Sequence, residues 1–457
     1  MKRLVIIGGS DAGIMAALRA KEIDPSAEVT VVLADEYPNY SICGLPFYLS
    51  GEITDSRTLA HRKREDLRRE GIRLLTCHTA TAVRPDSKSV VLSDSSGRQI
   101  VLPYDALVLA VGARSRKPSY VKGLDLPGLF FLRWMEDAFR LEGYVRENAP
   151  RSALIVGGGY IGMEMADALT RRGLDVTVVG RSRSVHKSVD LEFGRMIESE
   201  LERHGVTVAN EVAISEVSFQ AGKLTALGTN GFRAQTDLVL MATGAEPATD
   251  LAASAGIALG PNGAIQVNRR METSAPGIYA AGDCVETWHR LLQKPLYLPL
   301  GTTAHKQGRI AGENAVGGNR EYTGSLGTQV VKIFDLAVAR TGLLGFEAEI
   351  AGYSPLTVQT EDWDHKAYYP GARRLVIRVT GDRETGRLLG AQILGHWRSE
   401  IGKRIDIFAT AIHHGMLVHE LGDLDLSYTP PLSSPWDPVQ SCALAWERER
   451  LSARSIK

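Results

Sequence analysis

The chain has 457 residues, of which 44% are hydrophobic, and its 53 acidic side chains balance 53 basic ones. This balance argues against nucleic acid or a membrane surface as the main partner. The four cysteines are scattered and predict no disulfide framework. No apolar run approaches the ~18 residues that span a bilayer. The opening MKRLVIIGG is too short in its apolar part for a signal peptide. We therefore expect a cytoplasmic protein of about three domains.

Residues 3–36 predict a strand, a glycine turn, a helix and a second strand. The apolar run of residues 4–7 suits a parallel strand that is buried on both faces, and helical spacing follows over residues 12–23. The same unit recurs over residues 151–183. Two such units so far apart in one chain predict two nucleotide-binding domains.

Each unit is followed downstream by a strand that ends in a small-residue turn. These turns, AVG and ATG, contain Ala110, Gly112, Ala242 and Gly244. A third landmark, GIYAAGDC, is a short strand that leads into Gly282 and Asp283. From about residue 326, alternating segments followed by helices predict a C-terminal α+β domain.

The second unit carries a full G-x-G-x-x-G pattern at Gly157, Gly159 and Gly162. In such a loop the first glycine makes the tight turn, the second admits a pyrophosphate, and the third lets helix and strand pack closely. The phosphates then lie at the positive end of the helix. The alternative is a glycine turn that serves packing alone.

The first unit has serine where the middle glycine is expected. Its loop comprises Gly8, Ser10, Asp11, Ala12 and Gly13. The acid expected at the end of its second strand is also missing, because Leu33 lies near that place. Asp35, just beyond, is the candidate for binding a ribose.

Residues 38–51 (PNYSICGLPFYLSG) hold Cys43 with no second cysteine nearby. A Cys-x-x-Cys pair would predict an intrachain redox disulfide. Cys43 is therefore either a small buried hydrophobe or a redox or nucleophilic residue whose sulfur partner comes from elsewhere.

The two dinucleotide units, the AVG, ATG and GIYAAGDC turns and the lone cysteine together resemble the flavin-dependent pyridine nucleotide–disulfide oxidoreductases. The C-G-L-P setting of Cys43 resembles the single-cysteine branch of coenzyme A disulfide reductases, NADH oxidases, NADH peroxidases and persulfide reductases. The resemblance implies an α/β fold with two Rossmann-like dinucleotide-binding domains and a C-terminal α+β dimerisation domain. The implied limits are 1–112 with 246–325 for a discontinuous FAD-binding domain, 113–245 for the NAD(P)H-binding domain, and 326–457 for dimerisation.

The resemblance implies FAD in the first unit, with Asp283 on its ribityl or pyrophosphate part, and a nicotinamide cofactor in the second. It places Tyr160, with Ile161 beside it, as an aromatic gate over the flavin, and Glu164 as an acid on the nicotinamide side. The helix in residues 298–315, which carries Thr302 and Thr303, is implied to point its N-terminus at the flavin. A helix dipole there stabilises the anionic reduced ring.

The resemblance also places Cys43 against the flavin. Hydride then passes from the nicotinamide to the flavin, and an electron pair passes on to Cys43, oxidised as a mixed disulfide, a persulfide or a sulfenic acid. We expect the flavin and a helix terminus to lower the pKa of this thiol.

Two tyrosines, Tyr428 and either Tyr368 or Tyr369, match residues that reach the cysteine across a dimer interface in the coenzyme A disulfide reductases. A phenol there can protonate or steady a leaving thiolate. Packing at the interface would also account for these aromatic residues.

The chain departs from its relatives at positions that bear on the substrate. Asp11 stands where oxidases and peroxidases commonly carry histidine, which weakens oxygen or peroxide as the native acceptor. Arg19 and Lys21 match the basic residues of members that bind coenzyme A, whereas Glu22 and Ile42 do not fit that pattern. Coenzyme A derivatives and other small sulfur compounds both stay open as substrates.

The second unit favours NADPH. Its second strand ends at Val179, and Gly180 replaces the acid that would bind the ribose hydroxyls and repel a 2′-phosphate. Arg181 and Arg183 follow, and guanidinium groups bind phosphate oxygens well. The alternative is that both arginines are solvated loop residues.

The sequence therefore predicts a homodimeric, FAD-dependent NAD(P)H oxidoreductase that reduces a small disulfide, persulfide or polysulfide through Cys43. Nucleic acid and membrane partners are not expected, and no spacing of His and Cys resembles a metal site. One alternative is an NAD(P)H oxidase or peroxidase that cycles Cys43 through sulfenic acid, and another is a flavin-bearing redox-sensing binding protein. Cys442 is expected to be a buried helix residue, the alternative being a second thiol near the partner's active site.

Overall fold

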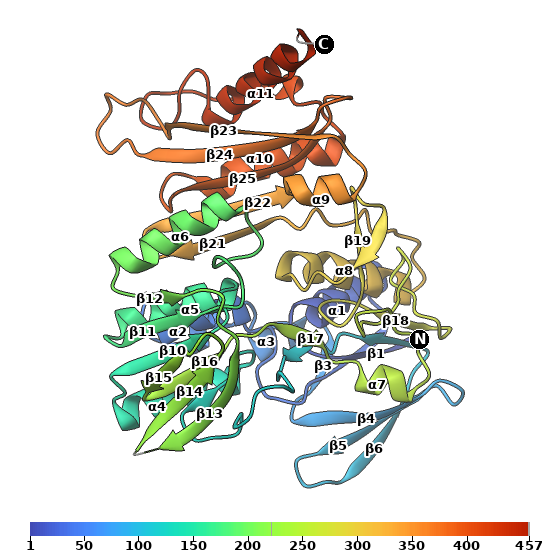
Figure 1. Ribbon diagram of the computed structural model, residues 1–457. Helices are drawn as coiled ribbons and strands as arrows, with labels where there is room; N and C mark the ends of the chain where they lie inside the picture. Colours follow the sequence, from blue (N-terminus) through green and yellow to red (C-terminus); the bar gives the residue numbers. More distant parts are fainter. Residues whose placement is uncertain (221, 456–457) are drawn as a thin grey trace.

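The computed structural model describes residues 1–220 and 222–455 (Figure 1). One five-stranded parallel sheet has the strand order β18-β7-β1-β2-β3. Its strands are β1 (Arg3–Ile7), β2 (Glu28–Val32), β3 (Ile72–Leu75), β7 (Ala106–Leu109) and β18 (Ile278–Ala280). We call this part the first lobe. Because β18 comes from far downstream, the lobe unites the two segments that the sequence assigned to one FAD-binding domain.

Two helices of the first lobe, α1 (Asp11–Ile23) and α8 (Gly301–Ala315), pack against each other in the same direction. A Cβ on Gly308 would lie 2.1 Å from the carbonyl oxygen of Ala12, and one on Gly312 would lie 2.1 Å from that of Ala16. Only glycine allows this approach. The N-termini of both helices therefore point toward the same end of the sheet, where their dipoles favour negative charge.

The rest of the first lobe is peripheral. An antiparallel sheet contains β4 (His78–Arg84), β5 (Ser89–Asp94) and β6 (Gln99–Pro103). The shorter elements of this lobe are η1 (Ile42–Gly44), α2 (Leu45–Leu49), η2 (Ser56–Leu59), α3 (Arg64–Arg69), α7 (Asp250–Ser254), β19 (Thr287–His289) and β20 (Lys294–Leu296). Antiparallel strands β8 (Ala113–Ser115) and β17 (Ala245–Pro247) carry the chain out to the second lobe and back.

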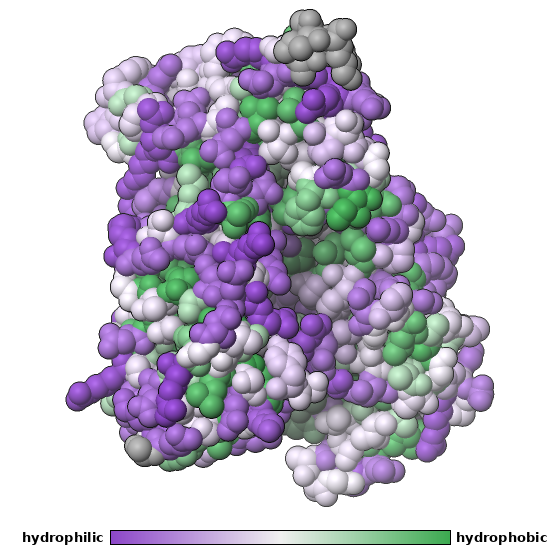
Figure 2. All heavy atoms as spheres, viewed as in Figure 1, coloured by the Kyte–Doolittle hydropathy of each residue, from purple (hydrophilic) through white to green (hydrophobic). Residues whose placement is uncertain are grey.

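The second lobe repeats the design with a parallel sheet of order β12-β11-β10-β16-β9. Its strands are β9 (Leu129–Phe130), β10 (Ser152–Val156), β11 (Asp175–Val179), β12 (Thr207–Ala209) and β16 (Leu238–Met241). Its helices are α4 (Met135–Asn148), α5 (Tyr160–Arg171) and α6 (Leu191–Arg203), and an antiparallel sheet adds β13 (Ile214–Gln220), β14 (Lys223–Gly228) and β15 (Arg233–Thr236). The surface is hollowed between the two lobes (Figure 2).

The C-terminal domain is an antiparallel sheet of order β21-β22-β25-β24-β23. Its strands are β21 (Gln329–Ile333), β22 (Leu336–Gly342), β23 (Pro355–Trp363), β24 (Arg374–Asp382) and β25 (Leu388–His396). Its helices are α9 (Gly345–Ile350), α10 (Ile401–His414), η3 (His419–Leu421) and α11 (Pro438–Ser455). The helices α10 and α11 pack against this sheet, while α5 and α6 of the second lobe contact β21 (Figure 1).

The large sheets show the α/β fold with its C-terminal α+β domain, while the residue limits of the three domains stay a prediction. Cys442 on α11 is fully buried, with its sulfur near the carbonyl oxygens of Val358 and Ile377 at 3.8 and 3.7 Å. Burial raises its pKa to about 11. Its expected place as a buried helix cysteine is confirmed. Among the described residues, no helix combines the length and apolar character needed to cross a membrane.

Candidate active site

The glycine turn of the second lobe joins β10 to α5. Gly157 has φ +122°, and a Cβ on it would lie 2.2 Å from the carbonyl oxygen of Ala242. A Cβ on Gly162 would lie 1.9 Å from the carbonyl oxygen of Gly157. Gly159, by contrast, has open space around it and precedes α5 without any side-chain cap. The three glycines thus serve a tight turn, an open approach to backbone N–H groups, and close packing.

The turn of the first lobe has the same backbone design. Gly8 has φ +112°, with a Cβ position 2.0 Å from the carbonyl oxygen of Ala110, and a Cβ on Gly13 would lie 1.9 Å from Gly8 O. Ser10 precedes α1, and its hydroxyl does not cap the helix. Asp11 follows in the first turn, where Oδ1 is buried without a hydrogen bond, 3.3 Å from Nε2 of His305 on α8.

The end of β2 lacks the ribose-binding acid, as the sequence predicts. Leu33 is buried there, and a Cβ on Gly9 would lie 2.1 Å from its side chain. Asp35 is partly buried, and its Oδ1 accepts a hydrogen bond of 2.9 Å from the backbone N–H of Tyr37. Desolvation is the main cause that raises the pKa of Asp35. Its role toward a ribose stays a prediction.

Asp283 meets a residue that the sequence did not single out. Its carboxylate forms an ion pair with Arg133, whose Nε is buried without a hydrogen-bond partner. Arg133 lies just before α4, where its backbone N–H and that of Trp134 each donate to Asp137 at 3.0 Å. Desolvation raises the pKa of Asp283, and the charge and hydrogen bond of Arg133 oppose this effect.

The N-terminal turn of α8 contains Thr302 and Thr303, next to the Asp283 segment. Thr303 lies 3.4 Å from the hydroxyl of Ser325. Further along the helix, Gln307 accepts a 3.0 Å hydrogen bond from the backbone N–H of Gly282. The strand turn at residues 281–283 is therefore fixed to the helix that the sequence expects to face the flavin.

Cys43 lies on η1, and its segment is tied to the first glycine turn. Asn39 is buried with φ +57°; its N–H donates to Gly9 O at 2.8 Å and its carbonyl accepts from His61 N–H at 2.9 Å. The Cys43 side chain itself is exposed. The position of the sulfur is thus set by backbone contacts rather than by burial in a core, which excludes the buried-hydrophobe alternative.

Acidic side chains surround Cys43 and act on the pKa of its thiol. Desolvation by the surrounding protein is the main cause that raises the pKa of this thiol, although one side of it is open to solvent. The carboxylates of Glu164, Asp11 and Asp283 raise it further, and Arg133 acts in the opposite direction. The protein's own groups thus raise the pKa of this thiol, while a lowering by a bound flavin stays a prediction. Residues of both lobes act on this one sulfur.

Glu164 lies on the second turn of α5. Desolvation, followed by the charge of Asp167, raises its pKa to about 7, while Lys332 lowers it. A carboxyl group with this pKa holds or releases a proton near neutral pH. It is therefore suited to proton transfer close to Cys43.

A cavity of about 340 Å³ lies over the second glycine turn. Predicted site residues that line it are Gly157, Gly159, Tyr160, Arg181, Ala242 and Gly244. Ile161 and Gly162 follow on α5, and Gly112 lies across the connection, where its carbonyl accepts from Ala248 N–H at 3.0 Å. The cavity has the position expected of a dinucleotide site.

The two predicted arginines of this cavity differ. Arg181 lines the cavity, with its guanidinium 5.8 Å from the centroid of the Tyr120 ring. Arg183 lies outside the lining and approaches Glu211 at 3.9 Å. Lys187, which the sequence analysis did not single out, is exposed and lines the cavity. The only signal in the sequence was its positive charge shortly after the strand.

Arg19 and Lys21 are held by the protein's own acceptors. Arg19 forms ion pairs with Glu22 at 2.8 Å and with Glu313 at 2.5 Å. Lys21 donates to two carbonyl oxygens of the following turn at 2.6 and 3.0 Å. Their role in substrate binding stays a prediction. To bind a substrate, Arg19 and Lys21 would have to give up these contacts for contacts with the substrate.

The three candidate tyrosines lie on the exposed surface of the C-terminal domain. Tyr428 is 45% exposed, and Tyr368 is 74% exposed. After desolvation, the neighbouring phenol of Tyr428 is the next cause that raises the pKa of Tyr368. Tyr369 instead packs edge-on against His365, with 5.9 Å between ring centroids. Tyr368 is therefore the residue that accompanies Tyr428.

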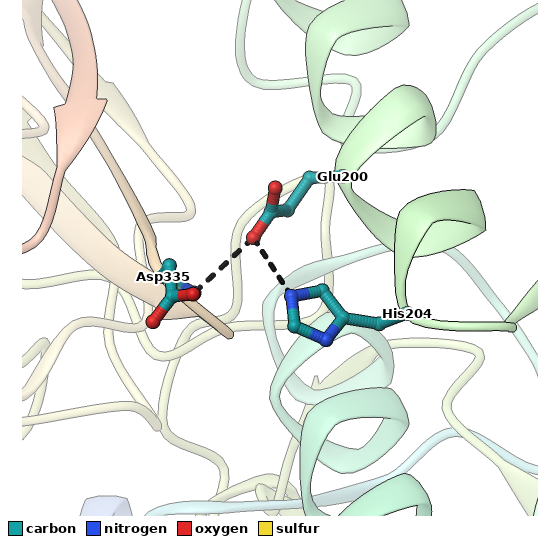
Figure 3. A group of neighbouring side chains, drawn as sticks. All are labelled: Glu200, His204 and Asp335. Carbon is teal, nitrogen blue, oxygen red and sulfur yellow. Dashed lines mark hydrogen bonds and ion pairs between the residues drawn. The ribbon is translucent and has the colours of Figure 1, made fainter.

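One group of possible metal ligands lies between α6 and the C-terminal domain, among the residues that the structure describes (Figure 3). Glu200 is 3.2 Å from His204 Nε2 and accepts a 3.2 Å hydrogen bond from the backbone N–H of Asp335. Arg203 pairs with Glu200 at 2.8 Å and with Asp335 at 3.5 Å. This guanidinium already neutralises the carboxylates, so the group is a contact between domains.

Comparison with known proteins agrees with this architecture. The model of the pyridine nucleotide-disulphide oxidoreductase family matches residues 2–308, and the model of its dimerisation domain matches residues 328–438. The chain is 35% identical to an NAD(P)H sulfur oxidoreductase (CoA-dependent) of Pyrococcus furiosus, over 96% of this chain and 97% of the relative. It is 30% identical to a coenzyme A disulfide reductase of Staphylococcus haemolyticus, over 96% and 98%.

Solved structures show the same fold. An NAD-dependent persulfide reductase from A. fulgidus superposes with a TM-score of 0.94 and 34% identity, over 98% of this chain and 84% of that one. An engineered water-forming NADPH oxidase, a mutant of the Lactobacillus brevis NADH oxidase, gives a TM-score of 0.94 and 26% identity over the whole of both chains. With both family models matched and the two-lobed fold in place, the chain belongs to the pyridine nucleotide-disulphide oxidoreductases.

Proposed function

We propose that this enzyme uses NADPH and FAD to reduce a small disulfide, persulfide or polysulfide at Cys43. The observation that carries the proposal is the position of Cys43 where the two dinucleotide units meet. Its segment is tied to the first glycine turn through Asn39, and the charge of Glu164, from the second lobe, acts on its sulfur. A single exposed thiol between two cofactor sites is suited to pass an electron pair to a sulfur substrate.

The first lobe fits FAD. The turn at Gly8 and Gly13 presents backbone N–H groups at the start of α1, and the buried unpaired Nε of Arg133 is a donor that an anionic group would satisfy. Arg133, Asp283 and the N-terminus of α8 would hold the cofactor. When bound, FAD supplies the transfer of electron pairs between the nicotinamide and the cysteine.

The protein's own groups handle sulfur and protons. The sulfur of Cys43 attacks a substrate disulfide, forms a mixed disulfide and releases one thiol; the electron pair that returns to Cys43 releases the second. Glu164, with its pKa of about 7, is placed to hold the proton that the leaving thiolate takes up. Arg133 favours the ionised form of Cys43 between these steps.

NADPH is the nicotinamide cofactor that we propose. The engineered NADPH oxidase replaces an Asp-Ala-Met run of its parent by Ala-Arg-Ser and, five residues further on, a proline by arginine. This chain has Gly180, Arg181 and Ser182 in a row, and Lys187 five residues further on. Arg181 and Lys187 both line the cavity, so we assign the 2′-phosphate to them rather than to Arg183.

We propose a homodimer in which Tyr368 and Tyr428 of one protomer face Cys43 of the other. The match to the dimerisation-domain family over residues 328–438 and the exposure of both phenols support this arrangement. A coenzyme A derivative is included among the substrates because one relative is described as CoA-dependent. A cytoplasmic location stays an expectation that rests on the scattered cysteines.

The second candidate function is oxygen or peroxide reduction, because a structural relative is a water-forming NADH oxidase. Asp11, whose carboxylate lies 3.3 Å from His305, occupies the position where oxidases and peroxidases of the family commonly carry histidine. This difference disfavours the second candidate. To separate the two, reduced enzyme is mixed under argon with coenzyme A disulfide, other small disulfides, polysulfide, peroxide or oxygenated buffer in a stopped-flow instrument. We expect a sulfur compound to reoxidise the flavin fastest. Faster reoxidation by oxygen or peroxide than by every sulfur compound would overturn the proposal.

A further inference from the structure

Tyr160, Ser188 and His186 make three contacts with one another in the wall of the cavity over the second glycine turn. Tyr160 is the first residue of α5, and its hydroxyl lies 2.9 Å from the hydroxyl of Ser188. Its ring meets the imidazole of His186 edge-on, with 4.5 Å between centroids. Ser188 in turn lies 2.9 Å from Nδ1 of His186. All three residues line the cavity over the second glycine turn, so these contacts link the two sides of its wall.

The loop that carries Ser188 is fixed at both ends. The N–H of His186 donates to the carbonyl oxygen of Gly158 at 2.6 Å. Arg340 of the C-terminal domain donates to the carbonyl oxygen of Ser188 at 3.0 Å, and Gln392 exchanges two hydrogen bonds with Asp190 at 2.8 and 2.7 Å. Ser188 is therefore held in place by its own loop and by the C-terminal domain.

His186 joins this set as an uncharged ring. The residue is 2% exposed, and burial lowers its pKa to about 4, so the ring is neutral near pH 7. One hydrogen bond then joins His186 Nδ1 to the Ser188 hydroxyl, and a second joins that hydroxyl to the Tyr160 hydroxyl. Nε2 of His186 is buried with no partner, so the closed arrangement leaves one polar atom unsatisfied. A rearrangement when cofactor binds can relieve that loss.

We propose that Ser188 and His186 latch Tyr160 across the cavity, and that a nicotinamide ring reaches the flavin only after the Tyr160–Ser188 hydrogen bond breaks. The inference rests on the proposed use of NADPH, and it goes beyond it by naming Ser188 and His186 as positioning residues for the gate. Removal of the latch hydroxyl destabilises the closed state alone, so dinucleotide affinity rises. One hydrogen bond of this kind corresponds to roughly a two- to tenfold change in the dissociation constant.

The test is calorimetric titration of the FAD-loaded enzyme and its Ser188→Ala variant. Two probes are compared: NADP⁺, and adenosine 2′,5′-bisphosphate, which carries the ribose phosphate but no nicotinamide. We expect Ser188→Ala to bind NADP⁺ two- to tenfold more tightly and the bisphosphate with wild-type affinity. Ser254→Ala, which removes a hydroxyl from the exposed helix α7, serves as control. Unchanged or weakened NADP⁺ binding, or equal changes for both probes, would overturn the latch.

A double-mutant cycle completes the test. Tyr160→Phe keeps the ring against His186 and removes the hydroxyl that meets Ser188. Because both changes break the same hydrogen bond, the double variant should bind NADP⁺ no more tightly than either single variant. Additive effects would contradict a shared bond. Suppose that the wild-type enzyme binds NADP⁺ and is reduced by NADPH, and that Ser188→Ala binds NADP⁺ with the same affinity. This result would reject the latch, while the proposed function would stand.

Discussion

The two glycine turns share one backbone design, and they differ at the positions that we propose to contact a ligand. In each lobe the first glycine has a positive φ and abuts the carbonyl of an alanine, and a Cβ on the last glycine would lie 1.9 Å from the carbonyl oxygen of the first. At the middle position, however, Ser10 stands in one lobe and Gly159 in the other. Leu33 and Gly180 come directly after the strands that follow. Positions that set the path of the chain are thus common to both lobes, and the positions that we propose to meet a cofactor differ.

The largest expected effect comes from breaking the shared design in one lobe at a time. Gly13→Val places a side chain onto the carbonyl of Gly8, and Gly162→Val does the same at Gly157. Overpacking against backbone lowers the free energy of unfolding by as much as ~3 kcal/mol, so each variant should have a lower melting temperature than the wild type. Gly13→Val should also lose bound flavin, whereas Gly162→Val should keep it and lose reduction by NADPH. Gly159→Ala, in open space, should melt as wild type does.

Flavin absorbance and thermal unfolding decide this comparison. Equal flavin content in Gly13→Val and Gly162→Val would contradict the assignment of FAD to the first lobe. Wild-type melting of both valine variants would contradict the close packing at the last glycine.

The second prediction sharpens the difference at the strand ends. Loss of one charged hydrogen bond costs ~1.5–3 kcal/mol, so Arg181→Ala should lower kcat/KM for NADPH roughly ten- to a hundredfold. NADH efficiency should change little. Arg183→Ala is the matched control, because Arg183 lies outside the cavity and approaches Glu211. Equal losses with NADPH and NADH, or a larger loss in Arg183→Ala, would contradict the phosphate site.

The third prediction concerns Glu164, which belongs to the second lobe yet acts on the cysteine of the first. Its charge raises the pKa of the Cys43 thiol, and its own pKa is about 7. Above pH 7 the wild-type carboxylate is ionised and disfavours the thiolate, so Glu164→Gln should be alkylated faster by iodoacetamide there. Below pH 7 Glu164 is protonated and neutral, and the two rates should converge. Equal alkylation rates of wild type and Glu164→Gln at every pH would show that the charge of Glu164 does not act on the Cys43 sulfur.

The fourth prediction concerns the C-terminal domain. Tyr428→Phe should slow the sulfur half-reaction, because we expect the phenol to protonate or stabilise the leaving thiolate. General acid catalysis of this kind contributes ~10²-fold to the rate. Flavin reduction by NADPH should keep its rate in stopped-flow experiments. Tyr369→Phe is the control, since Tyr369 packs against His365 away from the pair of Tyr368 and Tyr428. A slower flavin reduction with unchanged sulfur chemistry would show a misassigned role.

Local patterns explain how much of this structure the sequence predicts. The strands and both glycine turns follow from short runs of residues, because a turn with positive φ or a buried parallel strand is encoded within a few positions. The ion pair of Arg133 with Asp283 joins residues 150 positions apart, and nothing near either residue signals it. The raised pKa of Cys43 has the same origin, since it depends on how the two lobes pack.

The cavity over the second glycine turn shows the same limit on a smaller scale. The sequence singles out Arg181 and Arg183 alike, because both follow the strand at a short distance. Only the folded loop turns Arg183 toward Glu211 and brings Lys187 into the lining. The contact of Tyr160 with Ser188 likewise depends on the path of that loop, which the C-terminal domain fixes through Arg340.

The central claim is that Cys43 stores and passes on an electron pair, and an anaerobic titration with NADPH tests it most directly. Wild-type enzyme, first oxidised with a small disulfide, should consume one hydride equivalent for the flavin and a further one for Cys43, with release of one small thiol. Cys43→Ser should consume the flavin's equivalent alone and release no thiol, while Cys77→Ser, which changes another exposed cysteine, should titrate as wild type does. A wild-type enzyme that takes up no more hydride than Cys43→Ser would contradict the account.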